Sequence, residues 1–161
     1  MMMTETTMTT EARLTADGLR ELGACGPQVT LFEVTFPGGA PLTAEAVTAA
    51  RGAGLDVAWL AGHPSAPAGA LARLAGDGNA DVRREVAWNP QAPAAALALL
   101  AGDGDASVRG GVAGNPSAPA ETLVLLAGDG DASVRGGVAG NPQAPAGALV
   151  LLTGDGDASV R

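Results

Sequence analysis

The sequence predicts an all-α fold in which about three and a half two-helix repeats of 26 residues stack behind an N-terminal helical cap. Three observations predict this fold class. Consecutive units are nearly identical, since residues 89–114 and 115–140 differ at only four positions. Each unit has a double-proline start and an Asp/Gly-rich turn at its middle. Apolar residues recur at helical spacing on both sides of that turn. A fixed period of this length is typical of stacked repeat proteins.

The chain divides into three parts. We expect a disordered tail over residues 1–11, an N-terminal helical cap module over 12–62, and the repeats over 63–161. The copies are 63–88, 89–114, 115–140 and a partial fourth, 141–161. The Met/Thr-rich start lacks the basic and apolar regions of a signal peptide. Solenoids need caps, so we expect Trp59 and Phe32 to cover the first copy, with residues 56–62 echoing the second helix of a repeat.

The first helix of each copy is expected over 94–101 and its equivalents. Pro93 precedes it, and proline is favoured where a helix begins because its missing N–H costs nothing there. Leu97 and Leu100 lie three residues apart and therefore share one face. Gly102 then ends the helix. A helix this short is not stable alone in water, so the leucines must be buried against neighbouring copies.

The second helix is expected over 106–113. Asp105 precedes it, where a carboxylate accepts hydrogen bonds from free backbone N–H groups and interacts favourably with the helix dipole. Val108 and Val112 lie four residues apart and face one way. These valines are predicted to be buried with the leucines of the first helix.

Two glycines weaken the second helix. Arg84 and Glu85 of the first copy stand at the places of Gly110 and Gly111, which predicts that neither glycine is needed for close packing. Each glycine costs a helix up to about 1 kcal/mol relative to alanine. The second helix is therefore expected to be 3₁₀ or irregular.

One column of each first helix is a candidate binding surface. Arg73 in the first copy is followed by Leu99, Leu125 and Leu151. A position that accepts arginine is at least partly open to solvent, so the leucines would form a surface stripe. Alternatively, Arg73 extends its charge into solvent at the array end while the leucines pack between copies.

A column of arginines is a second candidate. Its members are Arg83, Arg109, Arg135 and Arg161. Such a ladder would bind phosphate or an acidic peptide. Alternatively, it pairs internally with an equally regular aspartate column, which consists of Asp77, Asp103, Asp129 and Asp155.

The last copy is a candidate assembly surface. It stops halfway through a unit, and it is expected to present Leu149, Leu152 and Val160 with no following copy to cover them. Exposed apolar patches mark interaction sites. Head-to-tail contacts that do not close generate filaments.

Composition excludes several function classes. The net charge is −8 and lysine is absent, which argues against nucleic-acid binding and disfavours an anionic membrane surface. Cys25 and His63 are the single members of their types, so we expect no disulfide within the chain, no metal or cofactor, and no catalytic constellation. Cys25 is expected to be a buried small residue. The Asp103-Gly104-Asp105 turn lacks the spacing of known calcium loops.

The repeat resembles the variant leucine-rich repeat, a family similar to HEAT-like α-solenoids. The resemblance covers about 100 residues and is carried in the second copy by Asn89, Pro90, Pro93, Leu97, Leu100, Ala101, Asp103, Asp105, Val108, Arg109, Val112 and Ala113. It implies α-helices alternating with 3₁₀ helices in a right-handed superhelix without β-strands. The iron–sulfur cysteine motif of some members is absent here, so no cluster is implied. The cap module resembles a bacterial and phage helical segment of unknown role.

The function expected from these observations is a non-enzymatic protein-interaction or scaffolding module in a bacterial cytoplasm, with another protein or a second copy of itself as partner. A competing interpretation is a self-assembling structural protein that joins through its uncovered C-terminal repeat. A third is an anion or nucleic-acid binder that uses the arginine column, which the acidic charge makes the least favoured.

Overall fold

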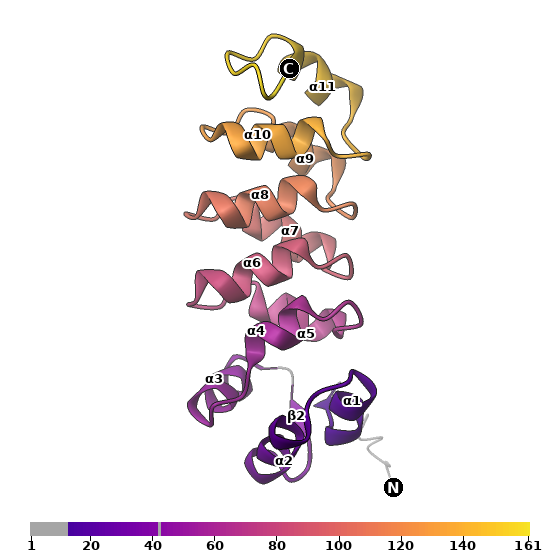
Figure 1. Ribbon diagram of the computed structural model, residues 1–161, viewed down its shortest axis with the longest axis vertical. Helices are drawn as coiled ribbons and strands as arrows, with labels where there is room; N and C mark the ends of the chain where they lie inside the picture. Colours follow the sequence, from indigo (N-terminus) through magenta and orange to yellow (C-terminus); the bar gives the residue numbers. More distant parts are fainter. Residues whose placement is uncertain (1–12, 42) are drawn as a thin grey trace, which may run out of the picture.

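The computed structural model describes residues 13–41 and 43–161, so the expected tail at 1–11 lies outside the described residues. Within them the fold is all-α apart from one two-residue strand pair, as the sequence predicts. Figure 1 shows an elongated stack whose helices follow one another from the N-terminal to the C-terminal end. None of the described helices is long and apolar enough to cross a membrane.

The N-terminal module contains four short helices and the strand pair. Their bounds are β1 Arg13–Leu14, α1 Ala16–Glu21, α2 Gly26–Thr35, β2 Ala40–Pro41, α3 Ala44–Gly52 and α4 Val57–Gly62. Strands β1 and β2 pair antiparallel, with Leu14 opposite Ala40. Thr15 and Thr43 cap α1 and α3 by accepting hydrogen bonds from backbone N–H groups. The strand pair lies outside the repeats, for which the family resemblance implies no β-strands.

The repeats supply the remaining helices in pairs. First helices are α5 Ala68–Leu74, α7 Ala94–Leu100, α9 Ala120–Leu126 and α11 Ala146–Thr153. Second helices are α6 Ala80–Trp88, α8 Ala106–Gly114 and α10 Ala132–Ala139. In Figure 1, α6, α8 and α10 form one layer and the first helices lie behind it. Helix α4 stacks on α6 as α6 stacks on α8, so the predicted echo of a second helix before the first copy is confirmed.

The second helix is α-helical in the first three copies, so the expectation of a 3₁₀ or irregular helix is wrong for α6, α8 and α10. Helix α8 runs for nine residues, and its cap Asp105 accepts a hydrogen bond from the N–H of Ser107. Val108 and Val112 are both fully buried. Capping and burial of this valine face therefore outweigh the low helix propensity of the glycines.

The two glycines are not equivalent. A Cβ at Gly111 would lie 2.9 Å from the Cβ of Ala87, whereas a Cβ at Gly110 would meet nothing within 4 Å. The expectation that both are dispensable for packing is therefore wrong for Gly111. The first copy accepts Glu85 because its side chain runs over Gly62, whose added Cβ would lie 2.8 Å from the carboxylate.

A continuous apolar core runs through the array. The leucine and valine columns are buried as predicted except at Leu149 of the partial fourth copy, and the side chains with no exposed surface include Leu71, Leu97, Leu123, Val86, Val108 and Val112. Burying each such side chain stabilises the fold by about 1.5–3 kcal/mol. The N-terminal module has its own smaller core, and Phe32 lies there rather than over the first copy. Trp59 packs against the same core, and Leu60 contacts both clusters.

Candidate functional site

Buried asparagines join consecutive copies. The Nδ2 of Asn115 donates to the carbonyls of Ala87 (2.7 Å) and Asn89 (2.9 Å) in the preceding units. Its Oδ1 accepts from the N–H of Ser117. Asn89 and Asn141 repeat this pattern. The asparagines therefore bind a carbonyl at a helix end, such as that of Ala87, and a second carbonyl, such as that of Asn89, which also accepts from the N–H of Ala92. The asparagines that start the later copies did not reveal this role in the sequence.

The arginine column pairs with the aspartate column across copies. Arg109 donates from Nε and Nη2 to both carboxylate oxygens of Asp129 in the next copy, at 2.7 and 3.0 Å. Its Nη1 donates to the backbone carbonyl of Asp103 in its own copy, at 2.8 Å. Arg83 and Arg135 make the same contacts. We call these three arginine–aspartate pairs the Arg–Asp ladder. They correspond to the internal pairing that the sequence offered as an alternative, and the carboxylate in each pair belongs to the following copy.

The ladder shifts the pKa values of its members. The guanidinium of Arg83 lowers the pKa of Asp103 by hydrogen bonding. In the same way, Arg135 lowers the pKa of Asp155 to about 2. The pKa of each paired arginine rises in return, because the carboxylate favours its charged form. Both partners are therefore held as ions, and the bidentate geometry fixes the spacing between copies.

The two ends of the ladder differ from its middle. At the N-terminal end, Arg51 of α3 forms an ion pair with Asp77, so the cap module supplies the arginine that the array itself lacks there. At the other end, the exposed Arg161 donates to the backbone carbonyl of Asp155. A binding role for the four arginines stays a prediction, and three of them have carboxylate partners already.

An apolar stripe runs along the first helices. Leu99, Leu125 and Leu151 are 62%, 66% and 61% exposed. These leucines therefore lie on the surface and are not packed between copies. Val124 and Val150 lie beside them and are also exposed. We call these five residues the apolar stripe. The only charged residue on α7, α9 and α11 is Glu121, so the stripe lies on a nearly uncharged surface.

The candidate assembly surface is only partly as expected. Leu152 and Val160 are buried in the core of the array, so they do not present an exposed surface. Leu149 is 40% exposed, whereas Leu123 in the same column is fully buried. Helix α11 of the following copy packs against α9, which carries Leu123.

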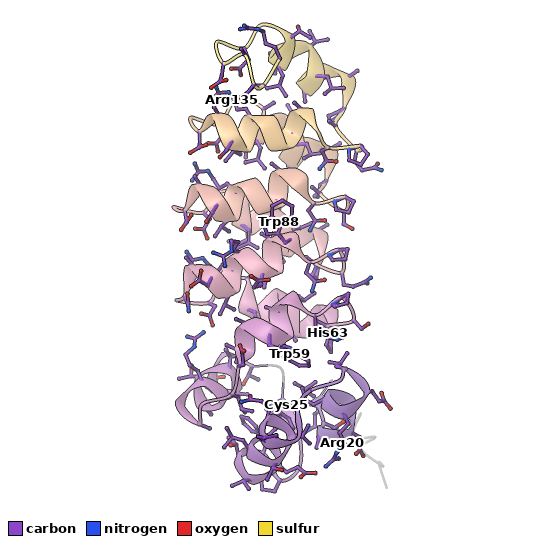
Figure 2. All side chains as sticks on the ribbon, viewed as in Figure 1. Arg20, Cys25, Trp59, His63, Trp88 and Arg135 are labelled. Atoms are coloured by element: carbon purple, nitrogen blue, oxygen red, sulfur yellow. The ribbon has the colours of Figure 1, made fainter. Side chains whose placement is uncertain are left out.

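A tryptophan interrupts the second-helix layer. Trp88 is 54% exposed and stands where other copies have glycine. A Cβ added to Gly114 would lie 2.9 Å from its ring, so the indole lies over α8. Figure 2 shows Trp88 at the middle of the stack, well separated from Trp59. The replacement of glycine by tryptophan in one copy was the sequence signal for this exposed aromatic residue.

Metal-ligating side chains do not cluster in the part of the chain that the structure describes. No group of three or more His, Cys, Asp or Glu there has the geometry to hold a metal ion. Cys25 is exposed at the start of α2, so the expectation of a buried cysteine is wrong. It caps that helix without a side-chain hydrogen bond.

One family model matches part of the array. Residues 106–131 match the model described as leucine rich repeat variant, so this stretch is similar to the family that the sequence resembles. The match spans the second helix of one copy and the first helix of the next. Searches of curated proteins and of solved structures gave no match. The resemblance of the N-terminal module has no support from these comparisons.

Proposed function

We propose that the array is a non-enzymatic protein-interaction module whose partner packs apolar side chains against the apolar stripe. The observation that carries this proposal is the exposure of Leu99, Leu125 and Leu151 at one-repeat intervals on a single side of the stack. Monomeric proteins rarely leave large contiguous apolar surfaces uncovered unless these surfaces bind something. The variant leucine-rich repeat at 106–131 is consistent with a module of this kind.

The stripe has the physical properties of a docking surface. Each of its leucines is about two-thirds exposed, and covering one stabilises a complex by about 1–2 kcal/mol. The helices that carry them are fixed by the Arg–Asp ladder and the buried asparagines. A rigid surface of this type loses little conformational entropy when a partner binds. The partner that fits is a polypeptide with apolar side chains on one face, such as an amphipathic helix.

Site-specific photocrosslinking tests the proposal. A photoreactive phenylalanine analogue at position 125 should trap the partner in cells that make this protein, and Leu99→Ser with Leu151→Ser in the same chain should abolish trapping. The same analogue at exposed Ser107, on a second helix, is the matched position for comparison. Equal trapping at the two positions would argue against docking on the stripe.

A stability control separates binding from folding. Leu125→Ser should change the free energy of unfolding by less than about 0.5 kcal/mol because the side chain is exposed. The neighbouring Leu126→Ser, at a buried position, should cost about 3 kcal/mol or more. Loss of trapping in a variant that stays as stable as the parent protein is then a binding effect.

Self-association is the competing outcome. Light scattering behind size exclusion, across a wide concentration range, distinguishes the two. A constant monomer mass supports a different protein as partner, whereas growth with concentration that Leu125→Ser reverses supports a second copy on the same stripe. Anion binding is less favoured because the ladder arginines donate to carboxylates. A cytoplasmic location stays a prediction.

A further inference from the structure

An open hollow lies where the cap module meets the array. It has a volume of about 440 Å³, and its walls include Asp56 and Trp59 of the α4 region, His63 after α4, and Glu85 of α6. Figure 2 shows Trp59 and His63 close together near the start of the array. The hollow is on the opposite layer from the apolar stripe, because α4 and α6 belong to the second-helix layer.

The walls of the hollow are acidic. Asp56 and Glu85 contribute two carboxylates, and the described residues that line the space include no arginine. The nearest base along the chain, Arg84, donates to Asp81 at 2.7 Å and lies 3.5 Å from Glu85. Its stronger interaction is therefore with Asp81, which is not part of the wall. Together with the net charge of −8, these carboxylates favour a cationic occupant over an anionic one.

The aromatic wall is held in place by local contacts. The rings of Trp59 and His63 have centroids 5.2 Å apart and are tilted by 46°. The Nδ1 of His63 accepts a hydrogen bond from the N–H of Ser65, which orients the imidazole. The backbone N–H of Trp59 donates to the carboxylate of Asp56. An indole beside carboxylates is the setting in which a cation gains both a ring contact and an ion pair.

We propose that this hollow binds the guanidinium of an arginine side chain presented by a protein partner. The inference rests on the proposed function in that it assumes a polypeptide partner, but it concerns a site separate from the apolar stripe. Arginine suits the hollow better than lysine because its planar group stacks on an indole and offers forked donors to a carboxylate. Glu85 and Trp59 are the residues that contact this group.

The equivalent place one repeat further along lacks this chemistry. Between α6 and α8, Trp88 replaces Gly62 and Gly111 replaces Glu85. A Cβ at Gly111 would lie 3.2 Å from the Trp88 ring, so the indole covers the place that a carboxylate occupies in the first copy. The arginine site is thus a feature of the divergent first copy and not of the repeat itself.

The test uses the full chain and three short peptides of identical length, Ac-Gly-Arg-Gly-Gly-NH₂ and its lysine and citrulline counterparts. The readout is the indole N–H resonance of Trp59 in ¹⁵N-labelled protein. Because the chain has two tryptophans, Trp88→Phe assigns the signal. The arginine peptide should move this resonance in a saturable way, the lysine peptide less, and the neutral citrulline peptide not at all.

Charge-removing variants complete the test. Glu85→Gln should weaken binding of the arginine peptide roughly fivefold. Adding Asp56→Asn should weaken it further, and asparagine still caps α4, so the helix is kept. Glu21→Gln, which removes the same charge from an exposed residue of α1 outside the hollow, should leave binding unchanged. Circular dichroism of each variant verifies its fold.

The outcomes separate this inference from the proposed function. Equal binding of the citrulline peptide, an immobile Trp59 resonance, or an equal effect of Glu21→Gln would overturn the arginine site. None of these results affects the crosslinking experiment at position 125. Specific trapping there would still support docking on the stripe. Conversely, Leu125→Ser should leave the peptide titration intact, so the arginine site would survive a failure of the stripe experiment.

Discussion

The buried Asn115 is the sharpest place to test how the copies hold together. It is fully buried, and its side chain makes three hydrogen bonds: two to carbonyls of the preceding units and one to the N–H of Ser117. Asn115→Ala removes all three and leaves the carbonyls of Ala87 and Asn89 without these donors. Each hydrogen bond contributes about 1 kcal/mol, and an unsatisfied buried carbonyl costs about 1–3 kcal/mol.

The expected loss of stability is therefore about 3–4 kcal/mol, a large part of the roughly 5–15 kcal/mol that holds a typical domain folded. Urea unfolding followed by far-ultraviolet circular dichroism measures it. Asn115→Asp keeps the size of the side chain but removes both donors and faces two carbonyl oxygens with a charge, so it should be at least as unstable. Gln91→Ala, at an exposed neighbour of the equivalent asparagine, is the control and should be nearly neutral.

Cooperativity gives a second readout of the same variant. Asn115 joins the third copy to the units before it, and both tryptophans precede it in the chain. Repeat arrays are stabilised by interactions between neighbours, so weakening one interface uncouples the two sides. Tryptophan fluorescence and circular dichroism should then report different midpoints. A destabilisation below about 1 kcal/mol with coincident midpoints would refute the reasoning, since each hydrogen bond alone should contribute that much.

Two further predictions use the same unfolding assays. Gly110→Ala should stabilise the protein by up to about 1 kcal/mol, whereas Gly111→Ala should destabilise it because the new methyl would lie 2.9 Å from the Cβ of Ala87; equal effects would contradict the packing. Arg135 lowers the pKa of Asp155 from 3.8 to about 2. The stabilising contribution of the ionised Asp155 carboxylate is therefore complete above pH 3.8 and is lost as the pH falls through about 2. Thermal midpoints should fall across this window, less steeply for Asp155→Asn, and an identical slope would contradict the assignment.

The fold was predictable because several sequence signals in each repeat indicate the same two helices. The leucine and valine columns, the proline entry and the Asp105 cap all agree, and the structure confirms them. The interactions between copies were harder to predict. A uniform column shows that a residue is constrained, but it does not show which copy supplies its partner. Arg109 therefore pairs with Asp129, twenty residues along the chain, and not with the carboxylate of its own copy.

Single departures from the repeat are ambiguous in the sequence for a related reason. Glu85 at the place of Gly111 suggested an open position, although the two residues have different neighbours. Gly62 leaves room for Glu85, while Trp88 fills the space above Gly111. Such exchanges are coupled across copies, so comparing one column at a time does not reveal them. The exposure of Leu125 was undecidable for a similar reason, since Arg73 is compatible with both a surface site and an array end.

The divergent first copy has a consequence for binding under the proposed function. The apolar stripe repeats with the period of the array, so a partner displaced by one repeat would make nearly the same apolar contacts. The apolar area buried on the stripe would therefore not by itself define the register of the complex. The hollow at Glu85 occurs at one end, and the exposed Trp88 follows it. The hollow and the stripe lie on opposite layers, so a partner that uses both must extend around the array from one layer to the other. Such a partner would lose the arginine interaction when displaced by one repeat, and so would bind in a single register.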